Sequence, residues 1–203
     1  MFSPRGRIGP KNRVTGKADR ADGQEGSTGQ GMGIWPFRRS RVGTDAQRLL
    51  EAVQAAGRRP ALFGAGRAPD TLEGRFEIMA LYAGQALLRL GAEPQAAPLA
   101  QAFTDTLFRH FDAGLREYGV GDTSVPKRMH KLAGDFYGRL DAYGRAITDQ
   151  DATALAAALV RNAGVSEDFA SRLAPHVLRI VAQQAEAPFV ALFESSAWPD
   201  FPG

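Results

Sequence analysis

The sequence predicts an all-α protein, a single helical domain of about six to seven helices with a disordered basic N-terminal tail. From residue 44 onward, apolar residues recur every three or four positions, the spacing that places them on one face of a helix. Capping residues and glycines stand where these segments begin and end. The sequence contains no stretch in which apolar and polar residues alternate as they do in a β-strand. A hydrophobic content of 44% is sufficient for a packed core.

Three predicted helices make up the first half of the domain, over residues 44–56, 72–90 and 94–118. Thr44 or Asp45 can cap the first of them, and Asp70 or Thr71 can cap the second. Gly119 ends the third helix. A helix end often needs a residue in the left-handed region, which glycine adopts at low cost.

Four predicted segments make up the second half, over residues 126–147, 152–163, 167–174 and 176–185. Asp122 or Ser124 can cap the first segment, Asp151 the second and Ser166 the third. Pro175 is expected to break or kink the helix that begins after Ser166, because proline removes a backbone donor. The last segment is therefore predicted to be a separate piece.

The predicted domain organisation is a tail over residues 1–43, a helical domain over residues 44–187 and an irregular C-terminal tail over residues 188–203. Residues 1–41 hold nine Lys and Arg against three acids, whereas the rest holds 16 bases and 19 acids. The sequence pI of about 9.5 thus reflects the tail and does not indicate a nucleic-acid-binding domain. The Gly-rich tail has too few apolar residues to fold, so we expect disorder. Met32 offers an alternative start for the chain.

Few features of the sequence suggest catalysis or a membrane span. The chain has no cysteine, which excludes disulfides, thiolate metal sites and cysteine nucleophiles. No uncharged apolar run approaches the roughly 18 residues of a spanning helix. His110, His130 and His176 fall on separate predicted helices without metal-ligand spacing, and no phosphate-binding loop is present. We therefore expect neither an enzyme nor a bound cofactor.

One charged stripe leaves an enzymatic alternative open. Asp105, Arg109, Asp112 and Arg116 lie four, three and four residues apart on one predicted helix face. Alternating signs at this spacing favour intrahelical salt bridges on a solvated surface. Two carboxylates seven residues apart could instead serve a helical lipid- or prenyl-handling enzyme, which would require Asp105 and Asp112 to face a deep apolar cavity.

The predicted helix over residues 126–147 has an unusual polar face. Its apolar stripe consists of Met129, Leu132, Phe136, Leu140, Tyr143 and Ile147. The opposite face holds Lys127, Lys131, Gly134, Gly138 and Arg145. Each glycine costs about 1 kcal/mol of helix stability relative to alanine, so a compensating role is expected. Small residues at this spacing allow a second helix to approach closely, and that helix could belong to a partner or to the same domain.

The same region carries a resemblance to a known family. The run LREYGVGDTSVPKRMHKLAGDFYGRLDAY, residues 115–143, is similar to the signature of the ubiquinol–cytochrome c chaperone family. The runs over residues 74–90 and 103–117 resemble the preceding helices of that family, and the likeness covers about residues 60–185. The motif positions that carry over are Arg116, Glu117, Gly119, Gly121, Asp122, Pro126, Lys127, Arg128, Phe136, Gly138, Arg139 and Tyr143.

This resemblance implies a helical chaperone without established catalytic residues. It would bind newly synthesised cytochrome b until haem insertion and assembly of ubiquinol–cytochrome c reductase proceed. In mitochondria, the relatives work with a small partner protein near the ribosomal tunnel exit, whereas bacterial relatives act without that partner. Contact with the ribosome is therefore a further expectation, and no specific nucleic acid is expected. We expect a bacterial, cytoplasmic protein that touches the inner membrane transiently. The predicted partner-binding residues are Arg116, Asp122, Lys127, Arg128, Lys131, Gly134, Gly138 and Arg139.

A third hypothesis is a membrane-surface module without a client. Trp35 and Phe37 stand beside Arg38, Arg39 and Arg41. Aromatic and basic side chains in this arrangement are typical of interfacial anchors.

Overall fold

The computed structural model describes residues 41–202. Within these residues there are six α-helices and no strand, which confirms the all-α prediction. They are α1 (Val42–Gly57), α2 (Leu72–Gly91), α3 (Ala97–Glu117), α4 (Val125–Thr148), α5 (Ala152–Ala163) and α6 (Glu167–Glu186). Short 3₁₀ turns lie at Pro60–Leu62 between α1 and α2, at Pro94–Ala96 between α2 and α3, and at Phe189–Phe193 and Ser195–Ala197 after α6. Residues 1–40 of the predicted tail, with the Met32 start and the Trp35–Arg39 part of the proposed anchor, lie outside the described residues, whereas Val42 and Gly43 belong to α1 and not to a tail.

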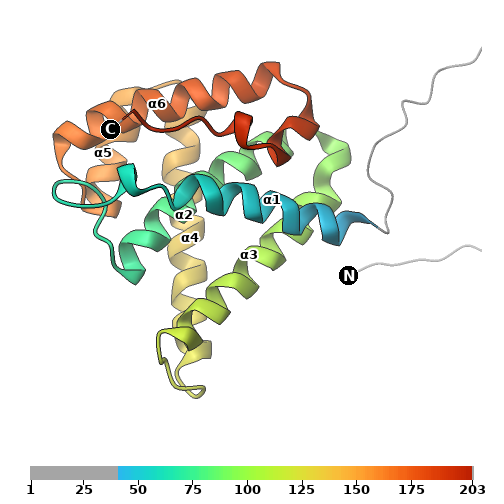
Figure 1. Ribbon diagram of the computed structural model, residues 1–203, viewed down its shortest axis with the longest axis vertical. Coiled ribbons are helices and arrows are strands. Elements are labelled where there is room, and N and C mark those ends of the chain that lie inside the picture. Colours follow the sequence, from blue (N-terminus) through green and yellow to red (C-terminus); the bar gives the residue numbers. More distant parts are fainter. Residues whose placement is uncertain (1–40, 203) are drawn as a thin grey trace, which may run out of the picture. The chain divides into compact units, whose positions relative to one another are not determined.

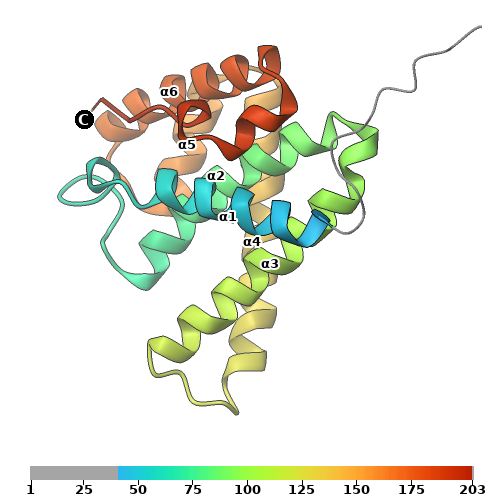
Figure 2. The same ribbon diagram turned by 45° about the vertical axis from the view of Figure 1, so that its right-hand side comes forward.

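The six helices pack in pairs around one apolar core. α5 packs on α6, α1 on α3 and α2 on α4. α3 and α4 are joined by a loop that lies far from α5 and α6 in both views, so the ends of these two helices project from the rest of the described chain (Figures 1 and 2). The loop end of the α3–α4 hairpin therefore has few other elements beside it.

Three predicted caps are confirmed. The side-chain oxygens of Thr71, Asp151 and Ser166 accept hydrogen bonds from the backbone N–H three residues later, at 3.2, 2.9 and 3.2 Å. These bonds satisfy donors that the first helical turn leaves without partners. The predicted cap at Thr44 or Asp45 is wrong. α1 begins at Val42, and Asp45 lies inside its first turn with only 8% of its surface exposed.

Pro175 does not break the last helix, contrary to the prediction. α6 runs without interruption from Glu167 to Glu186, and Pro175 lies on its exposed side. Residues on both sides of the proline, including Leu173 and Val177, are fully buried. Packing of both halves against the core offsets the missing backbone hydrogen bond, because tertiary contacts supply most of the stability of a protein helix.

The C-terminal segment, residues 188–202, belongs to the core. It contains no α-helix, yet Phe189, Leu192, Trp198 and Phe201 are buried. Arg59 holds the end of the segment: its guanidinium donates to the backbone oxygens of Trp198 and Pro199 and pairs with Asp200 at 2.7 Å. The segment thus closes the core over α1, α2 and α6.

The turn that ends α3 requires glycine. Gly119 has φ +80°, and its N–H donates to Arg116 O at 2.9 Å while Val120 N–H donates to Leu115 O at 3.1 Å. This pair of bonds is the Schellman arrangement, in which the left-handed residue is usually glycine. The prediction of a positive φ at Gly119 is confirmed.

Gly119→Val should lower the free energy of unfolding by about 1–2 kcal/mol, because a β-branched residue is strained at positive φ. The cost comes from φ alone, since a Cβ at this position meets no atom within 4 Å. Thermal unfolding of Gly119→Val and Gly119→Asn tests this, because asparagine tolerates the left-handed region and should cost less. An unchanged melting temperature for Gly119→Val would contradict the assignment.

Candidate partner-binding site

The loop of the α3–α4 hairpin is fastened by Arg116. Its guanidinium pairs with Asp112 at 2.7 Å in the preceding turn and with Asp122 at 2.5 Å across the loop. Hydrogen bonding to Asp112, followed by the charges of Asp112 and Asp122, raises the pKa of Arg116. The side chains of Arg116 and Asp122 are nevertheless 49% and 88% exposed. Both predicted site residues therefore shape the hairpin tip and remain accessible to a partner.

The outer surface of α4 is open along four predicted site residues. Lys127, Lys131, Gly134 and Gly138 are all exposed, and we refer to them as the α4 glycine face. A Cβ added at Gly134 or Gly138 would meet no atom within 4 Å. The possibility that another helix of the same domain packs against these glycines is therefore excluded for the described part of the chain. Lys131 pairs with Asp135 on its own helix, at 2.6 Å.

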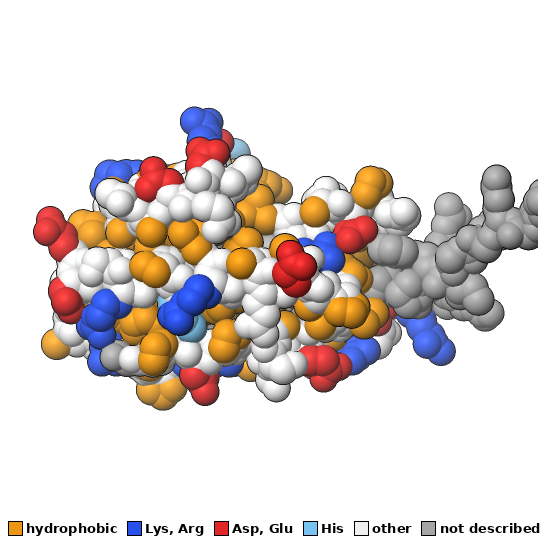
Figure 3. All heavy atoms as spheres, turned by 90° about the horizontal axis from the view of Figure 1, so that it is seen from above, with side chains coloured by type: hydrophobic (Ala, Val, Ile, Leu, Met, Phe, Trp, Pro, Cys, Tyr) orange, Lys and Arg blue, Asp and Glu red, His pale blue; other side chains and the backbone are white. Residues whose placement is uncertain are grey.

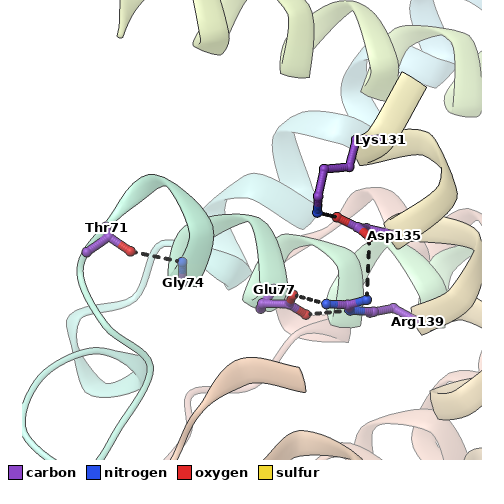
Figure 4. Close-up of polar contacts among 6 residues, drawn as sticks. All are labelled: Thr71, Gly74, Glu77, Lys131, Asp135 and Arg139. Carbon is purple, nitrogen blue, oxygen red and sulfur yellow. Dashed lines mark hydrogen bonds and ion pairs between the residues drawn. The ribbon is translucent and has the colours of Figure 1, made fainter. Parts of the chain in front are cut away.

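Arg128 and Arg139 flank the α4 glycine face and differ in their surroundings. Arg128 is exposed and lines a polar hollow beside the loop residues Gly119 and Gly121. Arg139 points inward and makes two hydrogen bonds to Glu77 of α2, at 2.6 and 3.0 Å (Figure 4).

The Arg139–Glu77 pair is an internal contact. Their side chains are 22% and 10% exposed, and a weaker contact at 4.0 Å joins Arg139 to Asp135. Hydrogen bonding to Glu77 raises the pKa of Arg139 against the opposing effect of burial. The sequence placed Arg139 among the partner-binding residues, but its geometry supports a structural tie between α4 and α2 instead. Its partner could not be identified from the sequence because Glu77 lies on a different helix.

The carboxylates of the enzymatic alternative do not converge on a cavity. Asp112 is paired with Arg116, as the spacing predicted. Asp105 accepts from Gln101 at 2.8 Å, whereas Arg109 donates to the backbone oxygen of Asp105 and to Thr106. Neither carboxylate lines the apolar hollow between α2, α3 and α4. Among the described residues, no group of His, Asp or Glu side chains could hold a metal ion. The geometry gives this alternative no support.

Sequence patterns did not reveal an apolar hollow of about 430 Å³ between the end of α1 and helices α2, α3 and α4. We call this cavity the apolar hollow. Its apolar lining consists of Leu72, Phe76, Met79, Phe111, Leu115 and Leu132, with Tyr118 at the rim. Every one of these residues belongs to the periodic apolar stripe of its helix, a pattern that predicts burial in the core. Residues of four helices line the hollow, and the stripe on one helix cannot show which part of it the other helices leave uncovered.

Exposed aromatic residues also gather on the hairpin. In the described part of the chain, the exposed large apolar residues are Tyr118, Tyr137 and Val190, at 62%, 55% and 47%. Two of these three lie on the α3–α4 hairpin, where Tyr137 borders the α4 glycine face and packs against Phe108. Tyrosine is enriched at protein interfaces. On the face seen from above, by contrast, hydrophobic side chains are scattered among charged ones (Figure 3).

None of the described helices combines the length and the apolar character that crossing a membrane requires.

Residues 65–191 match the family model described as ubiquinol-cytochrome C chaperone. The chain is also similar to the crystal structure of the Cbp3 homolog from Brucella abortus, with 38% sequence identity and a TM-score of 0.67. That alignment covers 82% of this chain and 93% of the Brucella chain. A comparison with curated protein sequences gave no match. The family match takes in α2 to α6 and therefore the whole α3–α4 hairpin.

Proposed function

The chain belongs to the ubiquinol–cytochrome c chaperone family, and from this premise we propose that it binds newly synthesised cytochrome b and aids assembly of ubiquinol–cytochrome c reductase. The family supports a non-enzymatic assembly factor for this complex. Cytochrome b is the client that the resemblance over residues 115–143 implies. The observation that carries the proposal is the match of the family across the whole hairpin, which also holds the exposed surface described above.

We propose that the α4 glycine face, together with Arg116, Asp122 and Arg128, is the surface that the client contacts. The open space over Gly134 and Gly138 gives these glycines no role in internal packing, although they weaken α4. A client helix could approach the α4 backbone closely at this spacing. The flanking bases would favour the C-terminal end of that helix or an acidic side chain on it. Arg139 contributes indirectly, by fixing α4 against α2.

Gly138→Leu tests this surface. The variant should be as stable as the native protein, or more stable by about 0.5–1 kcal/mol, because leucine is a better helix former than glycine. The added side chain should nevertheless block close approach and abolish co-purification of cytochrome b with the tagged protein. Thermal unfolding and mass spectrometry of the purified complexes measure the two effects.

Ala157→Leu is a matched control, because it enlarges a small exposed residue on α5, away from the hairpin. It should leave co-purification unchanged. Normal recovery of cytochrome b with Gly138→Leu would rule out the α4 glycine face as the contact surface. An unfolded Gly138→Leu variant would contradict the open environment of this glycine.

We also propose that the protein works in the bacterial cytoplasm and contacts the inner membrane and the ribosome near its tunnel exit only transiently. These locations follow from the family resemblance and from a client that is inserted into the membrane as it is made. Fractionation of the host should place the protein mainly in the cytoplasmic fraction. Co-sedimentation with ribosomes should depend on translation of cytochrome b.

A further inference from the structure

The apolar hollow adjoins a second hollow of opposite character. This basic hollow, of about 470 Å³, lies between α1 and α3. Its polar lining consists of Gln47, Gln54, Arg58, Thr106, Arg109 and His110. Arg58 and His110 line both hollows, which therefore meet at these two side chains.

The two arginines of the basic hollow are not held in ion pairs within the described part of the chain. No Asp or Glu lines the hollow, and neither Arg58 nor Arg109 forms an ion pair with a described residue. Arg109 is held in place by a hydrogen bond of 2.9 Å to the Thr106 hydroxyl and one of 3.3 Å to the Asp105 backbone oxygen. Two acids border this region: Glu51 accepts a hydrogen bond of 3.1 Å from Gln47, and Glu117 lines the apolar hollow.

The surroundings of His110, where the two hollows meet, lower the pKa of its imidazole. Burial lowers the pKa of His110, the charge of Arg58 lowers it further, and Glu117 opposes both effects only in part. At neutral pH this side chain is therefore uncharged. It can offer a hydrogen bond where the two hollows meet, while the two arginines supply the charge.

We propose that the two hollows form one binding site for a single-chain anionic lipid, with the alkyl chain in the apolar hollow and the carboxylate on Arg58 and Arg109. A volume of about 430 Å³ lies within the usual range of small-molecule sites, which are mainly apolar and aromatic with a few polar groups. A guanidinium binds a carboxylate through two parallel hydrogen bonds. Charge and shape thus complement an amphiphile with one apolar body and one anionic end.

Binding of a fluorescent long-chain fatty acid, cis-parinaric acid, to the full chain tests this site. The titration should saturate at one equivalent and should be reversed by oleate below its micelle-forming concentration. Methyl oleate has the same chain without the charge, and should compete at least about tenfold more weakly, because it loses the charged hydrogen bonds. Inorganic phosphate, which is a head group without a chain, should not compete.

Variants locate the ligand on the protein. Replacing Arg58 and Arg109 together by Gln should weaken binding about tenfold or more. Arg145→Gln removes the same kind of charge from an exposed position on α4 and should bind like the native protein. Tyr118→Ser alters the rim of the apolar hollow at a 62% exposed position, so it should keep the fold and weaken binding several-fold.

Three results would overturn the proposal: no saturable binding, equal competition by oleate and its methyl ester, or equal loss with Arg145→Gln and the double variant. If the double variant fails to fold, Tyr118→Ser and Arg109→Gln decide the question, and native affinity in both would exclude the site. The basic residues of the N-terminal region are present in every variant, so any nonspecific attraction by them cancels in the comparison.

Discussion

Trp198→Ala is expected to lower the free energy of unfolding by about 3–5 kcal/mol, the usual cost of removing a buried tryptophan. The Trp198 side chain is 1% exposed, and its Nε1 donates to Leu192 O at 2.9 Å. Its ring lies 6.1 Å from that of Tyr82 on α2. The substitution would leave a cavity between the C-terminal segment and α2, and a carbonyl oxygen without its donor.

Chemical denaturation of Trp198→Ala measures this loss. Val190→Ala is the matched control, because Val190 belongs to the same segment but is 47% exposed and should cost no more than about 0.5 kcal/mol. Trp198→Phe should fall between the two, since it keeps much of the apolar volume and loses the hydrogen bond. Equal stability of Trp198→Ala and Val190→Ala would show that the C-terminal segment does not close the core.

The helices were predictable where a short stretch of sequence determines them. Thr71, Asp151 and Ser166 cap helices through the backbone three residues later, and Gly119 ends one through its own φ. These features depend on neighbouring residues alone. The start of α1 and the continuity of α6 through Pro175 depend on packing against other helices, and both were mispredicted.

The C-terminal segment shows the same limit on a larger scale. Trp198 and Phe201 show no helical or strand periodicity, and they are buried against Tyr82 and Phe169, while Arg59, far earlier in the chain, binds the Trp198 and Pro199 oxygens. The candidate site was predictable to a similar extent. Helical spacing alone put Gly134 and Gly138 on the outer side of α4, but their freedom from neighbours and the apolar hollow depend on where the other helices lie.

Arg139→Met is expected to lower the free energy of unfolding by about 3 kcal/mol. Breaking a buried ion pair by removing one partner costs about 3–5 kcal/mol, because the other charge remains without compensation. The 22% exposure of Arg139 allows some hydration and places the expected loss at the lower end of that range. Methionine retains most of the aliphatic stem, so the loss reports on the stranded Glu77 carboxylate and not on lost packing.

Two further variants separate this explanation from a general sensitivity of α4. Arg145→Met breaks the ion pair between Arg145 and Asp141, which are 76% and 60% exposed. This variant should lower the free energy of unfolding by at most about 0.5 kcal/mol. Glu77→Leu combined with Arg139→Met removes both charges and should recover most of the loss, because apolar residues of similar size can replace a buried pair. Chemical denaturation of the three variants measures these differences. A double variant no more stable than Arg139→Met would mean that the stranded carboxylate is not the cause. α4 would then depend on the shape of the Arg139 side chain rather than on its charge.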